Sequence, residues 1–230
     1  MSGCVAIFFA LYGHLSTAFL AIMVGAVFDF FDGMTARLLN VSSPIGLELD
    51  SLADVVTFGV APSMMLFTQM HECSMLSVAR SLDTPGSSPL SLLVLYVPFL
   101  AFLMAAFSAL RLAKFNLDTR QKLGFIGLPT PANALFWGSF IVAWGKSLLV
   151  FPSFLPILLV MMFLSCYLLV SEIPMFALKF KTWGWKGNEV KWCFLVSCVP
   201  LLIFLGWGSM AAIVAWYVCL SVITAHRVVA

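Results

Sequence analysis

Charge is the scarcest property of this 230-residue chain. Asp, Glu, Lys and Arg together make up 10% of the residues, whereas a soluble domain carries roughly 25%. Hydrophobic residues make up 62%, and apolar stretches recur from one end of the chain to the other. The composition leaves no room for a separate water-soluble domain. It predicts an all-α, polytopic membrane helix bundle that forms one domain over residues 1–230.

Other familiar signals are also missing. The six cysteines are scattered through apolar runs, where a cysteine is usually a small buried hydrophobe. The "HEC" at 71–73 has no second half with ligand spacing, so the segment 71–89 is expected to be a solvated loop. The first residues contain no basic stretch and no cleavage site, which predicts a short first membrane helix and no signal peptide.

Gly, Pro, Ser and charged residues separate the apolar stretches and predict about eight transmembrane helices. The expected spans are 2–12, 15–39, 45–69, 90–113, 131–150, 154–178, 191–205 and 207–225. With both termini in the cytoplasm, all but two of the 12 Lys and Arg fall at cytoplasmic ends or loops, and the two exceptions are Arg80 and Lys146. This bias is what the positive-inside rule predicts.

Negative charge is concentrated where the chain is otherwise apolar. The stretch 27–54 holds Asp29, Asp32, Glu48, Asp50 and Asp54, which is half of the 10 acidic residues. Asp29 and Asp32 are three apart, Asp50 and Asp54 are four apart, and each pair therefore shares a helix face. "SSPIG" at 42–46 suits a turn followed by a helix start. The two helices are expected to be antiparallel neighbours that bring the four aspartates together near the cytoplasmic surface.

Carboxylates at this depth in a membrane need compensation. One ionised side chain costs about 2.5–3.5 kcal/mol at the centre of a membrane helix. Hard divalent cations prefer oxygen ligands, and Mg²⁺ typically takes one or two carboxylates. Four converging carboxylates therefore favour two divalent ions, an arrangement common in phosphoryl displacement.

Small and basic residues accompany the aspartates. Gly33, Ala36 and Gly46 allow either close helix packing or the approach of a substrate to the backbone. Arg37, one turn beyond Asp32, is either a cytoplasmic anchor or a ligand for a substrate phosphate.

The motif resembles that of a known family. Asp29-x-x-Asp32-Gly33-x-x-Ala36-Arg37, eight residues, then Gly46-x-x-x-Asp50-x-x-x-Asp54 is similar at every position to the signature of the CDP-alcohol phosphatidyltransferases. "LDSLADVVTFGVAPS" (49–63), "SALRLAKFN" (108–116), "GFIGLPTPA" (124–132) and "SEIPMF" (171–176) resemble the membrane-embedded phosphatidylserine synthases of bacteria. Lys114 stands where that subgroup more often has arginine, and the chain opens almost inside its first span, where relatives usually carry a polar segment.

The resemblance implies a site and a reaction. Asp29, Asp32, Asp50 and Asp54 would bind Mg²⁺ or Mn²⁺, Asp54 would also be the catalytic base, and Gly33, Ala36, Arg37 and Gly46 would surround the CDP group. The substrates would be CDP-diacylglycerol and L-serine, with no nucleic acid partner. Arg111 and Lys114 are candidates to bind the serine carboxylate or the lipid phosphate, and interface anchoring is the alternative for both. The resemblance further implies a bacterial inner membrane enzyme with its site facing the cytoplasm, and a homodimer.

Two alternatives remain open at this point. Within the family, the acceptor could be glycerol 3-phosphate or inositol phosphate. From a different class, intramembrane carboxylates also mark ion or proton pathways in transporters. A transporter would more naturally show related halves and carboxylates at mid-membrane, and the sequence contains no internal repeat.

Overall fold

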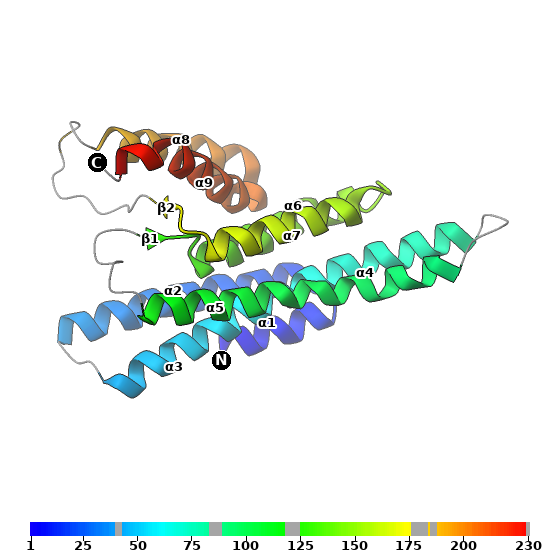
Figure 1. Ribbon diagram of the computed structural model, residues 1–230, viewed down its shortest axis with the longest axis horizontal. Helices are drawn as coiled ribbons and strands as arrows, with labels where there is room; N and C mark the ends of the chain where they lie inside the picture. Colours follow the sequence, from blue (N-terminus) through cyan, green and yellow to red (C-terminus); the bar gives the residue numbers. More distant parts are fainter. Residues whose placement is uncertain (40–42, 83–88, 118–124, 176–183, 185–187, 229–230) are drawn as a thin grey trace.

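The chain folds into a bundle of helices (Figure 1). The structure is a computed structural model, and it describes residues 1–39, 43–82, 89–117, 125–175, 184 and 188–228. In chain order the helices are α1 (Ser2–Leu11), α2 (Leu15–Leu39), α3 (Pro44–Asp54), the π-helical segment η1 (Val55–Val60), α4 (Ala61–Leu82), the 3₁₀ segment η2 (Pro89–Phe102), α5 (Leu103–Leu117), α6 (Thr130–Leu148), α7 (Phe154–Val170), α8 (Glu189–Leu205), the 3₁₀ turn η4 (Gly206–Gly208) and α9 (Ser209–Val228). Two short strands, β1 (Phe125–Ile126) and β2 (Pro174–Met175), pair antiparallel. The predicted all-α class is confirmed.

Several helices are long and apolar enough to cross a membrane. In the described part of the chain there are four such stretches, namely Leu15–Ala36, Pro44–Ser81, Leu93–Leu117 and Glu189–Thr224. Two shorter apolar helices, Ser2–Leu11 and Phe154–Val170, accompany them. The protein is therefore a multi-pass membrane bundle, and the exact number of eight spans stays a prediction.

The expected loop at 71–89 is wrong over its first part. Helix α4 continues to Leu82, and only 83–88 lie outside the described residues. The polar side chains there are compatible with a helix because their hydroxyls bond to the preceding turn: Ser74 Oγ donates to Met70 O at 2.9 Å, and Ser77 Oγ donates to Cys73 O at 2.8 Å. A run of polar residues that contains no Gly or Pro was a poor indicator of a loop.

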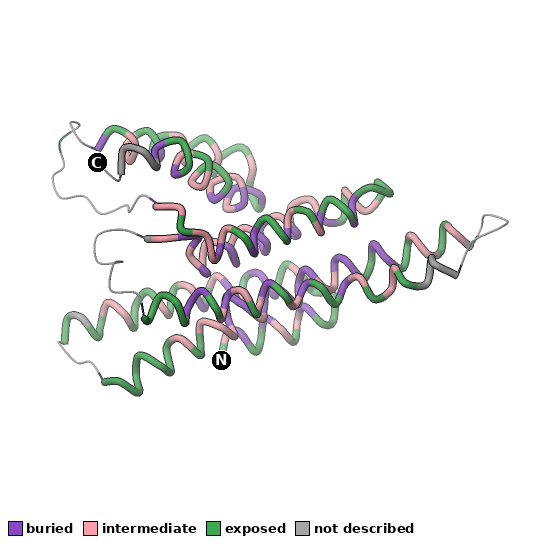
Figure 2. The backbone as a smooth tube through the Cα atoms, in the orientation of Figure 1, coloured by how far each residue is buried: buried purple, intermediate pink, exposed green. Residues whose placement is uncertain are grey.

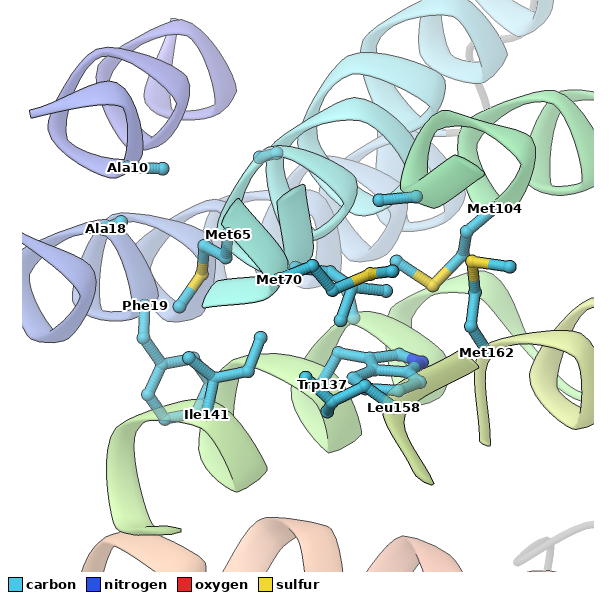
Figure 3. Close-up of a cluster of buried hydrophobic side chains, with 14 of the residues drawn as sticks. Ala10, Ala18, Phe19, Met65, Met70, Met104, Trp137, Ile141, Leu158 and Met162 are labelled. Atoms are coloured by element: carbon cyan, nitrogen blue, oxygen red, sulfur yellow. The ribbon is translucent and has the colours of Figure 1, made fainter. Parts of the chain in front are cut away.

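The helices stack in layers along one long direction. Figure 1 shows α6 and α7 between a layer of α1–α5 and an outer pair, α8 and α9. The core between the layers is rich in methionine: Met65, Met70, Met104 and Met162 surround the fully buried Trp137 (Figure 3). The indole Nε1 donates to Ser165 Oγ of α7 at 3.0 Å, which satisfies the one polar atom of that side chain.

The outside of the bundle is apolar as well. Figure 2 shows the outward sides of the helices as exposed and the facing sides as buried. On α7 and α8, Val160, Phe163, Ile203 and Phe204 are all more than half exposed. Such surfaces are rare on soluble monomers and suit helices that face a bilayer.

Three segments cross unusually closely beside the acidic stretch. A Cβ at Gly3 of α1 would lie 2.8 Å from the Cα of Thr57 in η1, and a Cβ at Gly25 of α2 would lie 2.6 Å from Thr57 Cγ2. Glycine lets α1 approach the backbone of the π segment and lets α2 approach the Thr57 side chain. Gly25 is one helical turn from Asp29, so this crossing sets the position of the site.

Candidate active site

The end of α2 and the start of α3 carry the acidic stretch. The local chemistry of the α3 start is as predicted: Ser43 is the N-cap, its Oγ accepts a hydrogen bond from Gly46 N at 3.0 Å, and Pro44 occupies the first helical turn. Residues 40–42 of the predicted turn lie outside the described residues. The capped helix runs back toward the bundle and ends at Asp54.

Three carboxylates from the two helices meet. One oxygen from each of Asp29, Asp32 and Asp50 lies within 4.8 Å of the other two. Asp29 is partly buried, and the other two are exposed. Among the side chains that the structure describes, which do not include that of Arg37, no Lys or Arg forms a salt bridge with any of the three. An all-oxygen donor set at this separation fits a hard divalent cation, which would offset the repulsion between the carboxylates.

Asp54 lies beside this group, on the side of the bundle interior. It is the last residue of α3, directly before the π segment, and its carboxyl is within hydrogen-bonding reach of Asp29. Arg111 of α5 is close enough to interact electrostatically with Asp54. The structure thus gathers all four predicted aspartates, with three in mutual contact range and the fourth within electrostatic range of Arg111.

Arg111 is placed differently from an ordinary interface anchor. The residue is 7% exposed, its guanidinium Cζ lies 5.4 Å from the centroid of the Phe115 ring, and its Nε has no hydrogen-bond partner among the described residues. A buried guanidinium with an unused donor is suited to bind an oxyanion. Lys114, three residues further on, is exposed, and no described contact joins it to the carboxylates.

The other predicted positions flank the carboxylates. Gly33 is partly buried and follows Asp32 on α2, Ala36 is exposed on the next turn, and Gly46 is exposed one turn before Asp50. Arg37 belongs to α2, but its side chain lies outside the described part of the structure. The small residues leave open surface beside the acidic group.

The structure adds residues to which the sequence assigned no definite role in the site. Tyr217 of α9 interacts with Arg111, although the two are 106 positions apart and no motif contains the tyrosine. Thr130 and Asn133, at the start of α6, are fully buried, and their side-chain polar atoms have no partner among the described residues. Their sequence signal was the "GLPTP" at 127–131, which predicts a rigid turn and includes Thr130 but not Asn133. Asn116 Nδ2 donates to Ser51 Oγ at 2.9 Å, which ties α5 to α3.

The sequence of this chain is similar to those of known proteins. The family model described as CDP-alcohol phosphatidyltransferase matches residues 1–171. A protein of Bacillus subtilis named CDP-diacylglycerol–serine O-phosphatidyltransferase is 39% identical over 133 residues, 56% of this chain and 62% of that protein. Proteins with the same name from Helicobacter pylori and Methanocaldococcus jannaschii are 35% and 36% identical over 135 and 121 residues, which cover 58% and 53% of this chain.

The alignments span only part of those proteins: about half of the Helicobacter and Methanocaldococcus relatives, at 49% and 48% of their length. The family model covers a larger part of this chain than these alignments do. It includes every helix from α1 to α7 and all four aspartates. This chain belongs to the CDP-alcohol phosphatidyltransferase family.

Proposed function

We propose that the chain transfers the phosphatidyl group of CDP-diacylglycerol to the hydroxyl of L-serine, giving phosphatidylserine and CMP. The convergence of Asp29, Asp32 and Asp50 from two helices to within 4.8 Å carries the proposal. The shared name of the relatives supports serine as the acceptor. We assign the activity to a single domain over residues 1–230, since α9 packs against α6 and β2 and so joins the end of the chain to the matched part.

The acidic group would hold divalent metal, and we propose two Mg²⁺ or Mn²⁺ ions held by Asp29, Asp32, Asp50 and Asp54. Bound divalent metal would neutralise the diphosphate oxygens and the negative charge that develops on CMP. Carboxylates carried by two converging helices would hold this centre in place before the substrate arrives. The exposure of Asp32 and Asp50 leaves the centre open to the nucleotide.

Asp54 is the proposed base. Its carboxylate removes the proton from the serine hydroxyl, and the serine oxygen forms a bond to the phosphorus that carries diacylglycerol. The bond from that phosphorus to the oxygen of CMP breaks, and CMP leaves with the electron pair. Arg111, beside Asp54 and with a free Nε–H, binds the serine carboxylate or the lipid phosphate and so orients the attack.

Other residues position the substrates. Gly33, Ala36 and Gly46 leave room for the CDP group next to the carboxylates, and Arg37 binds one of its phosphates. Thr130 and Asn133 offer buried polar atoms on the interior side, where an amino acid acceptor needs hydrogen-bond partners. Lys114, exposed on the last turn of α5, attracts anionic substrates toward the site.

The membrane setting follows from the same features. The basic residues favour an orientation in which the acidic group faces the cytoplasm, in the inner membrane of a bacterium. CDP-diacylglycerol would enter sideways from the cytoplasmic leaflet, with its acyl chains remaining in lipid. A homodimer is part of the proposal by family resemblance.

An acceptor assay tests the proposal. Purified protein is given CDP-diacylglycerol with serine, glycerol 3-phosphate or inositol phosphate, and CMP release is measured. Serine should be the preferred acceptor. Preference for another alcohol would contradict the assignment of serine but would leave the family assignment intact. Asp54→Asn should retain the fold and lose CMP release, and a fully active variant would remove Asp54 as the base. Ion flux in vesicles without any CMP release would instead support a transporter.

A further inference from the structure

A second polar site lies at the other end of α2. A pocket of about 260 Å³ is enclosed by the turn before α2, the middle of α4 and the second half of α6. The chain rises about 1.5 Å per residue in a helix, so His14 at the pocket is about 22 Å from Asp29 along α2. The pocket therefore opens toward the membrane face opposite the acidic group, and the transfer reaction does not use it.

One half of the pocket is built for an anion. Gly13, with φ of 76°, reverses the chain so that α2 begins at the pocket, and Ser16 and Thr17 of its first turn line the wall. The first backbone bond of the helix is donated by Ala18 N to His14 O at 3.0 Å. The amides ahead of Ala18 are thus at the positive end of a 25-residue helix that has no acidic residue in its first turn. Lys146 of α6 lines the same pocket, and together these groups suit a phosphate.

The other half is built for an amine. Gln69 and Glu72, three apart on α4, both line the pocket and share a helix face. Gln69 is fully buried: its Nε2 donates to Gly145 O at 3.3 Å, while its Oε1 has no partner among the described residues. A Cβ at Gly145 would collide with that oxygen, so close packing fixes the amide in place. A carbonyl oxygen and a carboxylate, both acceptors only, suit an N–H-bearing cation.

The two halves remain available to a ligand. In the described structure no salt bridge joins Glu72 to Lys146, and both side chains are exposed. Beside the pocket, Leu11 and Tyr12 at the end of α1 are 61% and 65% exposed, as expected of side chains that contact acyl chains. A ligand with a phosphate, a protonated amine and lipid tails would use every feature of the pocket and its rim.

We propose that this pocket binds the headgroup of a phospholipid that carries a phosphodiester and a primary amine, taken from the leaflet opposite the acidic group. The phosphate lies at the start of α2 beside Lys146, and the ammonium donates to Gln69 Oε1 and Glu72. A quaternary amine has no N–H to donate, and a headgroup without an amine leaves Gln69 and Glu72 unpaired. Primary-amine lipids are therefore preferred over both.

Binding is measured on the full chain in detergent, as retained lipid by native mass spectrometry and as the rise in melting temperature. The lipids are phosphatidylethanolamine, phosphatidylcholine and phosphatidylglycerol with the same acyl chains, and glycerophosphoethanolamine supplies the headgroup without tails. Phosphatidylethanolamine should bind at least fivefold more tightly than either other lipid. Equal binding of the three lipids would overturn the proposal, and glycerophosphoethanolamine binding as tightly as phosphatidylethanolamine would overturn a lipid source.

Variants locate the binding. Glu72→Gln and Lys146→Met should each weaken phosphatidylethanolamine binding at least fivefold, because each removes the charge that faces one half of the headgroup. Glu189→Gln neutralises an exposed acid at the start of α8 and should leave it unchanged. Unchanged binding in both pocket variants would refute the site. The headgroup comparison on the unaltered protein stands even if a variant fails to fold, and no readout depends on phosphatidyl transfer, so the two proposals fail separately.

Discussion

Gly3→Ala tests whether the close crossing of α1, α2 and η1 positions the acidic group. The added Cβ would lie 2.8 Å from Thr57 Cα and 3.0 Å from Thr57 N, about 0.6 Å and 0.4 Å short of ordinary 3.4 Å contact. The clash is with backbone, so no rotamer relieves it. Overpacking of this kind costs about 1–3 kcal/mol, and we expect a melting temperature several degrees lower.

The same variant should lower activity more than its stability loss explains. The η1 segment follows Asp54 without a break, so moving Thr57 moves Asp54, the proposed base, and the end of α3. A displacement approaching 1 Å at a reacting group can cost about 10²-fold in rate. Gly3→Ala should therefore reduce serine-dependent CMP release at a temperature where the protein is still folded.

Gly25→Ala is the matched comparison. Its Cβ would lie 2.6 Å from Thr57 Cγ2 and 2.7 Å from Ser2 Oγ, which are side-chain atoms only. Thr57→Ala should therefore rescue much of the melting temperature of Gly25→Ala but little of that of Gly3→Ala, by thermal unfolding of the single and double variants in detergent. Equal rescue of both, or a Gly3→Ala protein that matches the parent in stability and activity, would refute the reasoning.

The remaining predictions concern single side chains. Asp50→Asn removes one of three converging ligands and should abolish metal-dependent CMP release, as should exhaustive chelation of the parent protein; residual turnover in chelator above a few per cent would argue against a metal centre. Arg111→Met should lower kcat/KM by about 10²-fold, in line with the loss of one charge-stabilising donor. Lys114→Met should change kcat/KM only a few-fold. A larger loss of kcat/KM in Lys114→Met than in Arg111→Met, measured by steady-state kinetics, would exchange the roles of the two residues. Ser139→Ala should destabilise the protein by about 1–3 kcal/mol, because Ser139 Oγ donates to Trp207 O at 2.6 Å and accepts from Ala211 N at 3.0 Å; an unchanged melting temperature would show that these groups find other partners.

The sequence was most informative where spacing and chemistry coincide. Asp29, Asp32 and Asp50 are brought together as expected, because three- and four-residue spacings fix a helix face and the Ser43–Pro44 start fixes the hairpin. The helix Ser2–Leu11 also appears as predicted. In both cases local rules were sufficient.

The rest depends on contacts between distant segments. Tyr217 meets Arg111 only because α9 packs onto α6 and β2, and no local pattern specifies that packing. The burial of Asn133 and Gln69 also depends on packing between distant segments. An amide in an apolar helix is compatible with either a lipid-facing or an interior position. Helix α4 extends beyond its predicted end because Ser74 and Ser77 donate hydrogen bonds to carbonyls of their own helix. A count of polar residues does not detect such bonds.

The π-helical segment η1 joins the acidic helix α3 to the core helix α4. A π turn holds about one residue more than an α turn, so it rotates everything after it relative to everything before it. The aspartates of α3 can then face α2 while Met65 and Met70 face the core, within one unbroken helix. Removing a single residue from 55–60 would leave the hydrophobicity profile and every signature residue intact, yet swing the acidic face toward lipid. Insertions and deletions at this junction should thus be far less tolerated than substitutions.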